Sequence, residues 1–224
     1  MNIHNINICD TNLRFEFIVS VPSHVLSEVK GYVTEFECKV LYYIEDYLND
    51  EDEKVIGKLS GYRFPLYDCY WNFDEENNDY IHALDLFDMI NDEVARLICL
   101  FNKNGRIKPQ YLKLIPELDY GLPNIILIKR VEILADYRGK KVGESLISKS
   151  IYTIGKNNDL VIVDPAPLQF LGQSQENNEW NQEMKFTEFK SNNKIARKKL
   201  NNYYKKLGFQ PLADKLMFLI YLQP

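Results

Sequence analysis

The chain has 224 residues, of which 46% are hydrophobic and 26% charged, and this composition is that of an ordinary globular protein with one sizeable core. Its net charge of −5 argues against a general nucleic-acid binder, because such proteins carry a basic excess that displaces counterions from phosphates. We expect a single domain over residues 1–224.

The cysteines and the N-terminal segment indicate in which cellular compartment the protein is expected. The four cysteines lie about thirty residues apart: Cys9, Cys38, Cys69 and Cys99. They form no C-x-x-C pair and the three histidines do not cluster, so neither a metal site nor a disulfide framework is expected. The first residues lack the basic-then-apolar layout of a signal peptide, and no run approaches the roughly twenty apolar residues of a membrane span. We therefore expect a cytoplasmic protein with reduced thiols and no membrane partner.

The N-terminal half is organised by pattern alone. Residues 13–21 alternate as a first strand, and the apolar positions of Ser23–Lys39 recur at helical spacing, which predicts a first helix. Val40–Leu48 and Val55–Leu66 are predicted to form a long hairpin around the acidic run 49–54, which we interpret as a solvated turn.

Glycines, one helix and a proline-containing segment complete this half. Gly57 and Gly61 lie inside the second hairpin strand and predict a bulge or a sheet edge. Ile81–Phe101 is predicted to be one amphipathic helix. Residues 106–123 contain three prolines and are interpreted as a linker or a small extra element.

A buried strand, a short turn and an amphipathic helix follow one another from Asn124 to Ile154. The strand spans Ile125–Leu134 and the turn carries Asp136–Gly139. The apolar positions of the helix recur at helical spacing: Val142, Leu146, Ile147, Ile151 and Ile154. Such a helix N-terminus is an anion site, because the N–H groups of the loop and of the first helical turn point outward together and the helix dipole adds positive charge.

The hexapeptide Arg138–Gly143 follows an apolar strand and Tyr137, and it resembles the acetyl-CoA pyrophosphate loop of the GNAT N-acetyltransferase superfamily. That loop has the pattern Gln/Arg-x-x-Gly-x-Gly/Ala, so Arg138 stands at its first position and Gly143 at its last. Lys141 occupies the position of the middle glycine, which brings a bulky side chain near the phosphates.

A second segment carries the same resemblance. Ala196–Phe209, followed by the apolar strand Lys215–Leu222, is similar to the last helix of the superfamily, which ends Tyr-x-x-Leu-Gly-Phe before the closing strands. Here the ending is Tyr204–Phe209, and Gly208 stands where a helix favours a left-handed residue. The two motifs, in this order, make residues 124–222 the most diagnostic part of the chain.

The resemblance implies an α/β fold with a mixed, mostly antiparallel sheet of six or seven strands, splayed at its centre, and with helices on both faces. Between the two motifs, Leu160–Val163 is predicted to be a short strand that ends at Asp164 and Pro165, because proline cannot donate to a sheet ladder. Residues 168–193 are interpreted as a polar insertion beside the acceptor groove, either a substrate lid or an inert surface loop.

The activity implied by the resemblance is transfer of an acetyl group from acetyl-CoA to a primary amine, by direct attack on the thioester and without a metal. A β-bulge in the fourth strand would free a backbone N–H for the thioester oxygen, and this strand would pair with the pantetheine. By position, these main-chain groups belong to Val131, Glu132 and Ile133. The pyrophosphate would be held by the loop and the first helical turn: Arg138, Gly139, Lys140, Lys141, Val142, Gly143 and Glu144.

Proton transfer needs an acid and a base. Tyr204 matches the general-acid tyrosine of the family, which gives the leaving thiolate its proton. Its neighbour Tyr203 leaves open which of the two faces the sulfur, and either ring on an apolar helix face also fits a core role. The candidates for the base are Asp164, Glu132 and water, although an aspartate before a proline is also a common turn initiator.

The last helix is strongly basic, with cations at these positions: Lys194, Arg197, Lys198, Lys199, Lys205 and Lys206. We expect most of them to form a solvated face and one or two to meet the 3′-phosphate of CoA. The acceptor amine, on a small molecule, peptide or protein, cannot be read from the sequence, and a homodimer is left open.

Two rival hypotheses stay open. Lys141 in place of glycine keeps open a non-catalytic member of the fold that binds CoA or only a partner protein. The basic last helix is the sole support for a modifier of charged transfer RNA or another macromolecule.

Overall fold

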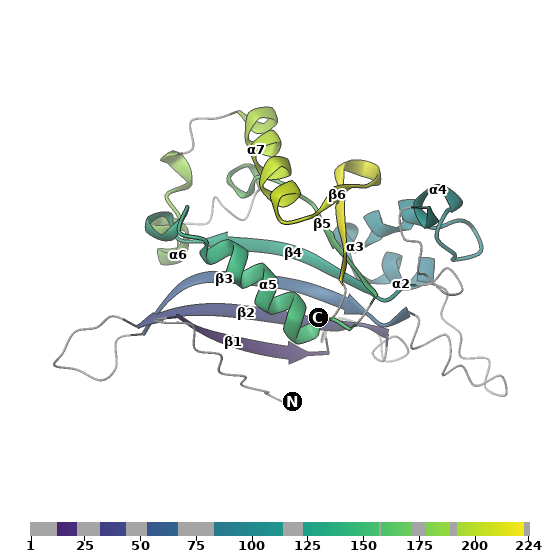
Figure 1. Cartoon of the computed structure of the whole chain (residues 1–224), viewed down its shortest axis with the longest axis horizontal. Helices are drawn as coiled ribbons and strands as arrows, with labels where there is room; N and C mark the ends of the chain where they lie inside the picture. Colours follow the sequence, from purple (N-terminus) through teal and green to yellow (C-terminus); the bar gives the residue numbers. More distant parts are fainter. Residues whose placement is uncertain are drawn as a thin grey trace.

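The computed structural model describes residues 13–21, 32–43, 53–66, 83–113, 123–156, 158–171, 178–188 and 192–221. Within these ranges, seven strands form one sheet in the order β1-β2-β3-β4-β5-β7-β6 (Figure 1). Strands β4 and β5 run parallel, and the other neighbouring pairs are antiparallel. The fold is therefore α/β with a mixed, mostly antiparallel sheet, as predicted.

The strands are β1 Leu13–Ser20, β2 Thr34–Tyr43, β3 Glu53–Phe64, β4 Ile125–Ile133, β5 Asp159–Val163, β6 Gln210–Pro211 and β7 Met217–Tyr221. The α-helices are α2 Ala83–Ile90, α3 Asp92–Ala95, α4 Pro109–Leu112, α5 Val142–Ile154, α6 Glu179–Glu183 and α7 Asn193–Lys206. Short 3₁₀ segments are η2 Arg96–Leu100, η4 Ala135–Tyr137, η5 Leu168–Phe170, η7 Phe186–Glu188 and η8 Ala213–Lys215.

Two apolar clusters lie on opposite faces of the sheet. One packs α5 and the end of α7 against the sheet, and the other packs α2, α3 and η2 against it (Figure 1). In β4, Ile126 and Ile128 belong to the first cluster, whereas Ile125 and Leu127 belong to the second. A strand buried on both faces has a continuous apolar sequence, which explains the run in β4 and in β5. The predicted placement of helices on both faces is confirmed.

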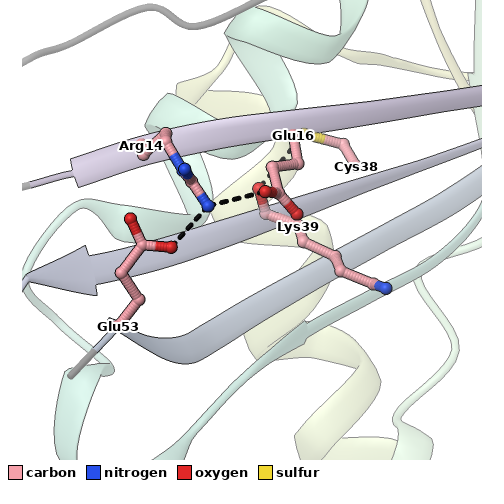
Figure 2. A network of polar contacts seen from close by, with 5 residues as sticks. All are labelled: Arg14, Glu16, Cys38, Lys39 and Glu53. Carbon is pink, nitrogen blue, oxygen red and sulfur yellow. Dashed lines mark hydrogen bonds and ion pairs between the residues drawn. The ribbon is translucent and has the colours of Figure 1, made fainter. Parts of the chain in front are cut away.

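Strands β1 and β2 alternate instead, with one buried face and one polar face. Phe15 and Phe17 lie in the cluster under α5. On the polar side, Arg14 donates to Glu16 at 2.6 Å and also forms an ion pair with Glu53 at the start of β3 (Figure 2). Partly exposed pairs of this kind contribute about 0–1 kcal/mol, so burial of the aromatic side chains is the larger stabilising effect.

The prediction of a helix over Ser23–Lys39 is wrong for the part that the structure describes. Residues 34–39 belong to β2, and residues 23–31 lie outside the described ranges. Phe36, Cys38 and Val40 are buried at every second position, so the strand period decides the structure here.

The single helix predicted over Ile81–Phe101 is also wrong, because the chain breaks at Asn91. This residue has extended backbone with φ −174°, and its side chain accepts a hydrogen bond from Val94 N at 3.0 Å. Asparagine is a favoured N-cap, so it begins α3, and a 3₁₀ segment follows from Arg96.

Other predictions are confirmed. Strands β2 and β3 pair antiparallel as a hairpin, and the register shifts at Ser60 and Gly61. Helix α7 is followed by Gly208 with φ +92°, and residues 106–123 contain the short helix α4. None of the helices in the described ranges has the length and apolar character that crossing a membrane requires.

Candidate functional site

The parallel pair β4–β5 opens partway along its length. The pairing joins Ile125–Ile128 to Leu160–Val163 and stops there. Strand β4 continues to Ile133, whereas β5 ends before Asp164 and Pro165. In the described ranges, the edge of β4 beyond Ile128 therefore has no strand beside it on the β5 side.

A β-bulge lies at the point where the pair opens. Ser60 pairs with Arg130 and Gly61 with Ile128, which leaves Lys129 as the extra residue in β4. We predicted the bulge within residues 131–133, and this is wrong: those residues pair regularly with β3. Bulges re-aim backbone groups beside functional sites, so the prediction of a bulge is right and its position is shifted toward the closed part of the pair.

A cavity of about 520 Å³ occupies the opening between β4, β5, α5 and α7. Several residues predicted for the site line it: Val131, Ile133, Arg138, Gly139, Lys141, Gly143, Glu144, Asp164, Tyr203 and Tyr204. Three predicted residues do not line it. Glu132 is buried and paired with Arg130 at 2.9 Å, Val142 lies in the core, and the exposed Lys140 amine sits 5.3 Å from the ring centre of Tyr137.

The loop before α5 presents unpaired backbone donors. Helix α5 makes its first hydrogen bond from Ser145 N to Lys141 O at 3.0 Å. Within the described part of the chain, the N–H groups of residues 139–144 donate no backbone hydrogen bond. These donors lie at the N-terminus of a 13-residue helix, where the dipole favours an anion.

Two loop residues have left-handed backbone, Gly139 with φ +75° and Lys141 with φ +64°. Lys141 is the position at which the resemblance expects glycine, and it adopts a conformation that glycine favours. A lysine pays about 1–2 kcal/mol of strain there. The loop thus has left-handed backbone at a residue other than glycine.

The Arg138 side chain makes hydrogen bonds to backbone carbonyls outside the loop. Its Nε donates to Ile133 O at 2.9 Å and its Nη2 donates to Met184 O at 2.7 Å. Burial lowers the pKa of this guanidinium from its usual value, and nearby Glu188 opposes that shift. The guanidinium still carries its charge at neutral pH.

The two adjacent tyrosines of α7 both line the cavity, but they differ in burial. Tyr204 is 5% exposed and packs edge-to-face against Phe209 and Tyr203. Tyr203 is half-buried, and its hydroxyl lies 3.0 Å from the place of a Cβ added to Gly143. Burial raises the pKa of Tyr203 to about 12 and raises that of Tyr204 further, so both keep their protons at neutral pH.

Asp164 is held between two arginines at the end of β5. Its Oδ2 is paired with Arg96 of η2, and its Oδ1 accepts from Arg197 of α7 at 2.7 Å. A carboxylate with both oxygens on guanidinium groups is a clamp between elements, and to act as a base it has to give up one of these contacts. Its role as the base stays a prediction.

Sequence reasoning missed several cavity residues. Met184 and Phe186 come from the polar insertion, and they line the cavity although no motif marks them. Their only signal is that Trp180 and Met184, four apart, are large apolar residues in a polar run. Lys199, one of six cations on the last helix, lines the cavity and stands one turn before Tyr203.

We compared the chain with models of protein families, with curated proteins and with solved structures. None of these comparisons found a match. The functional argument therefore depends on the geometry of the site.

Proposed function

We propose that this protein is an N-acetyltransferase of the GNAT type, which moves an acetyl group from acetyl-CoA to a primary amine. The observation that carries the proposal is the opening of the β4–β5 pair at Ile128 beside a helix N-terminus with unpaired N–H groups. Such an opening offers the edge of a strand to an extended ligand, and the helix N-terminus offers donors to its pyrophosphate.

The cavity fits acetyl-CoA in its chemistry. The free edge of β4 at Val131 supplies the kind of main-chain groups that bind amides, whereas the Ile133 carbonyl already accepts from Arg138, and residues 139–144 supply donors for phosphate. Lys141 and Lys199 add positive side chains to the lining. Acetyl-CoA contributes the activated acyl group as a thioester.

The chain supplies two aids to the transfer. In the reaction, the amine nitrogen forms a bond to the acyl carbon and the carbon–sulfur bond breaks. The backbone at the Lys129 bulge would stabilise negative charge on the acyl oxygen, and Tyr204 would give its proton to the sulfur. Water or Asp164 would take the proton of the amine, and Glu132 is disfavoured because it lies outside the cavity lining.

A second cavity of about 300 Å³ is a candidate place for the acceptor. It shares Lys129, Arg130 and Leu168 with the first cavity, so the two meet at the opening of the sheet. Asp92 and Glu93, both exposed in the first turn of α3, also line it. Their carboxylates can accept hydrogen bonds from an amine, and the cations Lys129 and Arg130 of the same lining offset their charge.

The test has two steps. Isothermal titration with acetyl-CoA measures binding, and a thiol-release assay over polyamines, aminoglycosides and lysine peptides measures turnover. We expect acetyl-CoA to bind with micromolar affinity and free acetate not to bind. We also expect release of the CoA thiol with at least one amine. If the titration detects no heat of binding at millimolar acetyl-CoA, the proposal is wrong.

Binding without turnover would support a non-catalytic CoA-binding protein instead. One observation favours that alternative: both oxygens of Asp164 are engaged by arginines, so the site has no unencumbered carboxylate base among its described lining residues except the exposed Glu144.

A further inference from the structure

Residues 178–188, which we call the strap, lie against the loop before α5. The strap comprises α6 and η7, and it follows the loop by about forty residues in sequence. Met184 of the strap is buried, and both Met184 and Phe186 line the 520 Å³ cavity. The strap is therefore one wall of that cavity.

The strap is attached to its surroundings by contacts of unequal strength. Lys185 pairs with Asp136 at 2.9 Å, and Glu183 pairs with Lys54 at 2.5 Å. These side chains are largely exposed, and such pairs are weak.

The contact through Arg138 is better protected from solvent. The guanidinium donates in two directions, to Ile133 O at the end of β4 and to Met184 O in the strap, and its Nη2 also lies 3.6 Å from Met184 Sδ. Hydrogen bonds from a charged donor are stronger than those between neutral groups, and half-burial limits competition from water.

We propose that Arg138 is a positioning residue, which holds the strap against β4 as a wall of the coenzyme cavity. The role in coenzyme binding rests on the proposed function, and the attachment of the strap does not. In this arrangement the backbone N–H groups of residues 139–144 bind the anion, and the side chain at the head of the loop builds the wall beside it.

The alternative is that the Arg138 charge acts on the phosphates directly. The two roles differ in what they require. A phosphate contact requires a positive charge, which lysine also has. Holding the strap against β4 requires two donors of one planar group that reach two carbonyl oxygens. The substitution Arg138→Lys therefore distinguishes the two roles.

Trp180 of the strap provides a readout that needs no coenzyme. Its ring lies under the Lys58 amine, which is 3.9 Å from the ring centre, and its side chain is half-buried. The chain has two tryptophans, so Trp71→Phe leaves Trp180 as its only tryptophan, which can be excited selectively at wavelengths that tyrosine does not absorb. Quenching by acrylamide then measures how well the strap is held.

In the Trp71→Phe background, we expect Arg138→Gln to raise the acrylamide quenching constant of Trp180 by about twofold, because the strap opens locally. Lys140→Gln is the matched control, since it removes one positive charge from the same loop, and Lys140 is not among the residues that line the 520 Å³ cavity. It should leave the quenching constant unchanged. Arg138→Lys should behave like Arg138→Gln.

Affinity for acetyl-CoA gives the second readout, by titration calorimetry on the same variants. We expect about a tenfold loss for both Arg138→Gln and Arg138→Lys, and a smaller loss for Lys140→Gln. Circular dichroism confirms that each variant is folded, and Arg138→Lys replaces Arg138→Gln if the latter is not.

Unchanged quenching of Trp180 in the Arg138 variants would overturn the proposal, and so would an equal increase in Lys140→Gln. If Arg138→Lys keeps its affinity for acetyl-CoA and Arg138→Gln loses it, the Arg138 charge acts on the phosphates directly. If the wild-type protein binds no acetyl-CoA, the proposed function fails, while the quenching result still decides whether Arg138 holds the strap.

Discussion

The two parts of strand β4 make an instructive comparison. From Ile125 to Ile128 the strand pairs on both sides, and its side chains are buried on both faces. From Lys129 to Ile133 it has β3 as its only neighbouring strand in the described ranges, and most of its side chains are half-buried or line the cavity. We call these the closed part and the open part. One strand thus contributes packing at one end and a binding surface at the other, so substitutions should affect unfolding in the closed part and binding or turnover in the open part.

The largest effect is expected at Gly61, which faces the closed part. A Cβ there would lie 2.3 Å from Leu127 O and 2.6 Å from Phe36 Cζ. The carbonyl belongs to a paired strand and cannot move away, so Gly61→Ala should lower the free energy of unfolding by about 3 kcal/mol, as overpacking in a core does. Urea unfolding measures the change.

Gly139→Ala is the control for this substitution. Gly139 has φ +75°, and a Cβ there would meet no atom within 4 Å, so only backbone strain of about 1 kcal/mol is expected. Equal losses of stability at the two glycines would contradict the contact with Leu127.

The next effect concerns turnover in the open part. Tyr204→Phe should lower kcat for thiol release by about a hundredfold, since a positioned acid contributes on that order. Because the substitution keeps the ring that packs on Phe209, the free energy of unfolding should change by less than about 1 kcal/mol.

Tyr203→Phe is the matched control. Its hydroxyl lies beside Gly143, at the loop end of the cavity, so kcat should fall less than threefold, roughly 0.7 kcal/mol. A large loss in Tyr203→Phe and none in Tyr204→Phe would reverse the assignment of the acid.

A smaller effect is expected at the mouth of the loop. Gly143→Val places a branched side chain against the Tyr203 hydroxyl, because even a Cβ would come within 3.0 Å of it. The ring should move into the cavity and weaken binding of acetyl-CoA by about tenfold, or roughly 1.4 kcal/mol. Ser148→Val, on the exposed side of α5, introduces the same branched side chain into the helix and should leave binding intact.

The two sequence motifs come together at the open part. The Arg138–Gly143 motif and the Tyr204–Phe209 motif combine local backbone requirements with a fixed order, and the structure brings both to one cavity. The position of the bulge was not readable, because a glycine in β3 shows only that one strand is irregular and not which residue of its partner is extra.

Elements that depend on long-range packing were predicted less well. The helix expected at Ser23–Lys39 competes with a strand period, and pairing with β1 and β3 decides between them over residues 34–39. The strap shows the same limit, since Met184 meets Arg138 across 46 positions and no local pattern indicates it.

The smallest expected effect is a dependence of stability on pH, which comes from a buried thiol on the closed side of the sheet. Burial raises the pKa of the Cys38 thiol from 9.0 to about 12, in the same apolar cluster as Ile126 and Ile128, whereas Tyr203 beside the open part begins from 10.0. The folded protein keeps the Cys38 proton above pH 9 and the unfolded chain loses it, so stability falls as pH rises from about 9 toward 12. Between pH 8 and pH 9.5 the free energy of unfolding should fall by about 1 kcal/mol, measured in urea under reducing conditions. Cys38→Ala should remove most of this fall, and an unchanged fall in that variant would place the titrating group elsewhere.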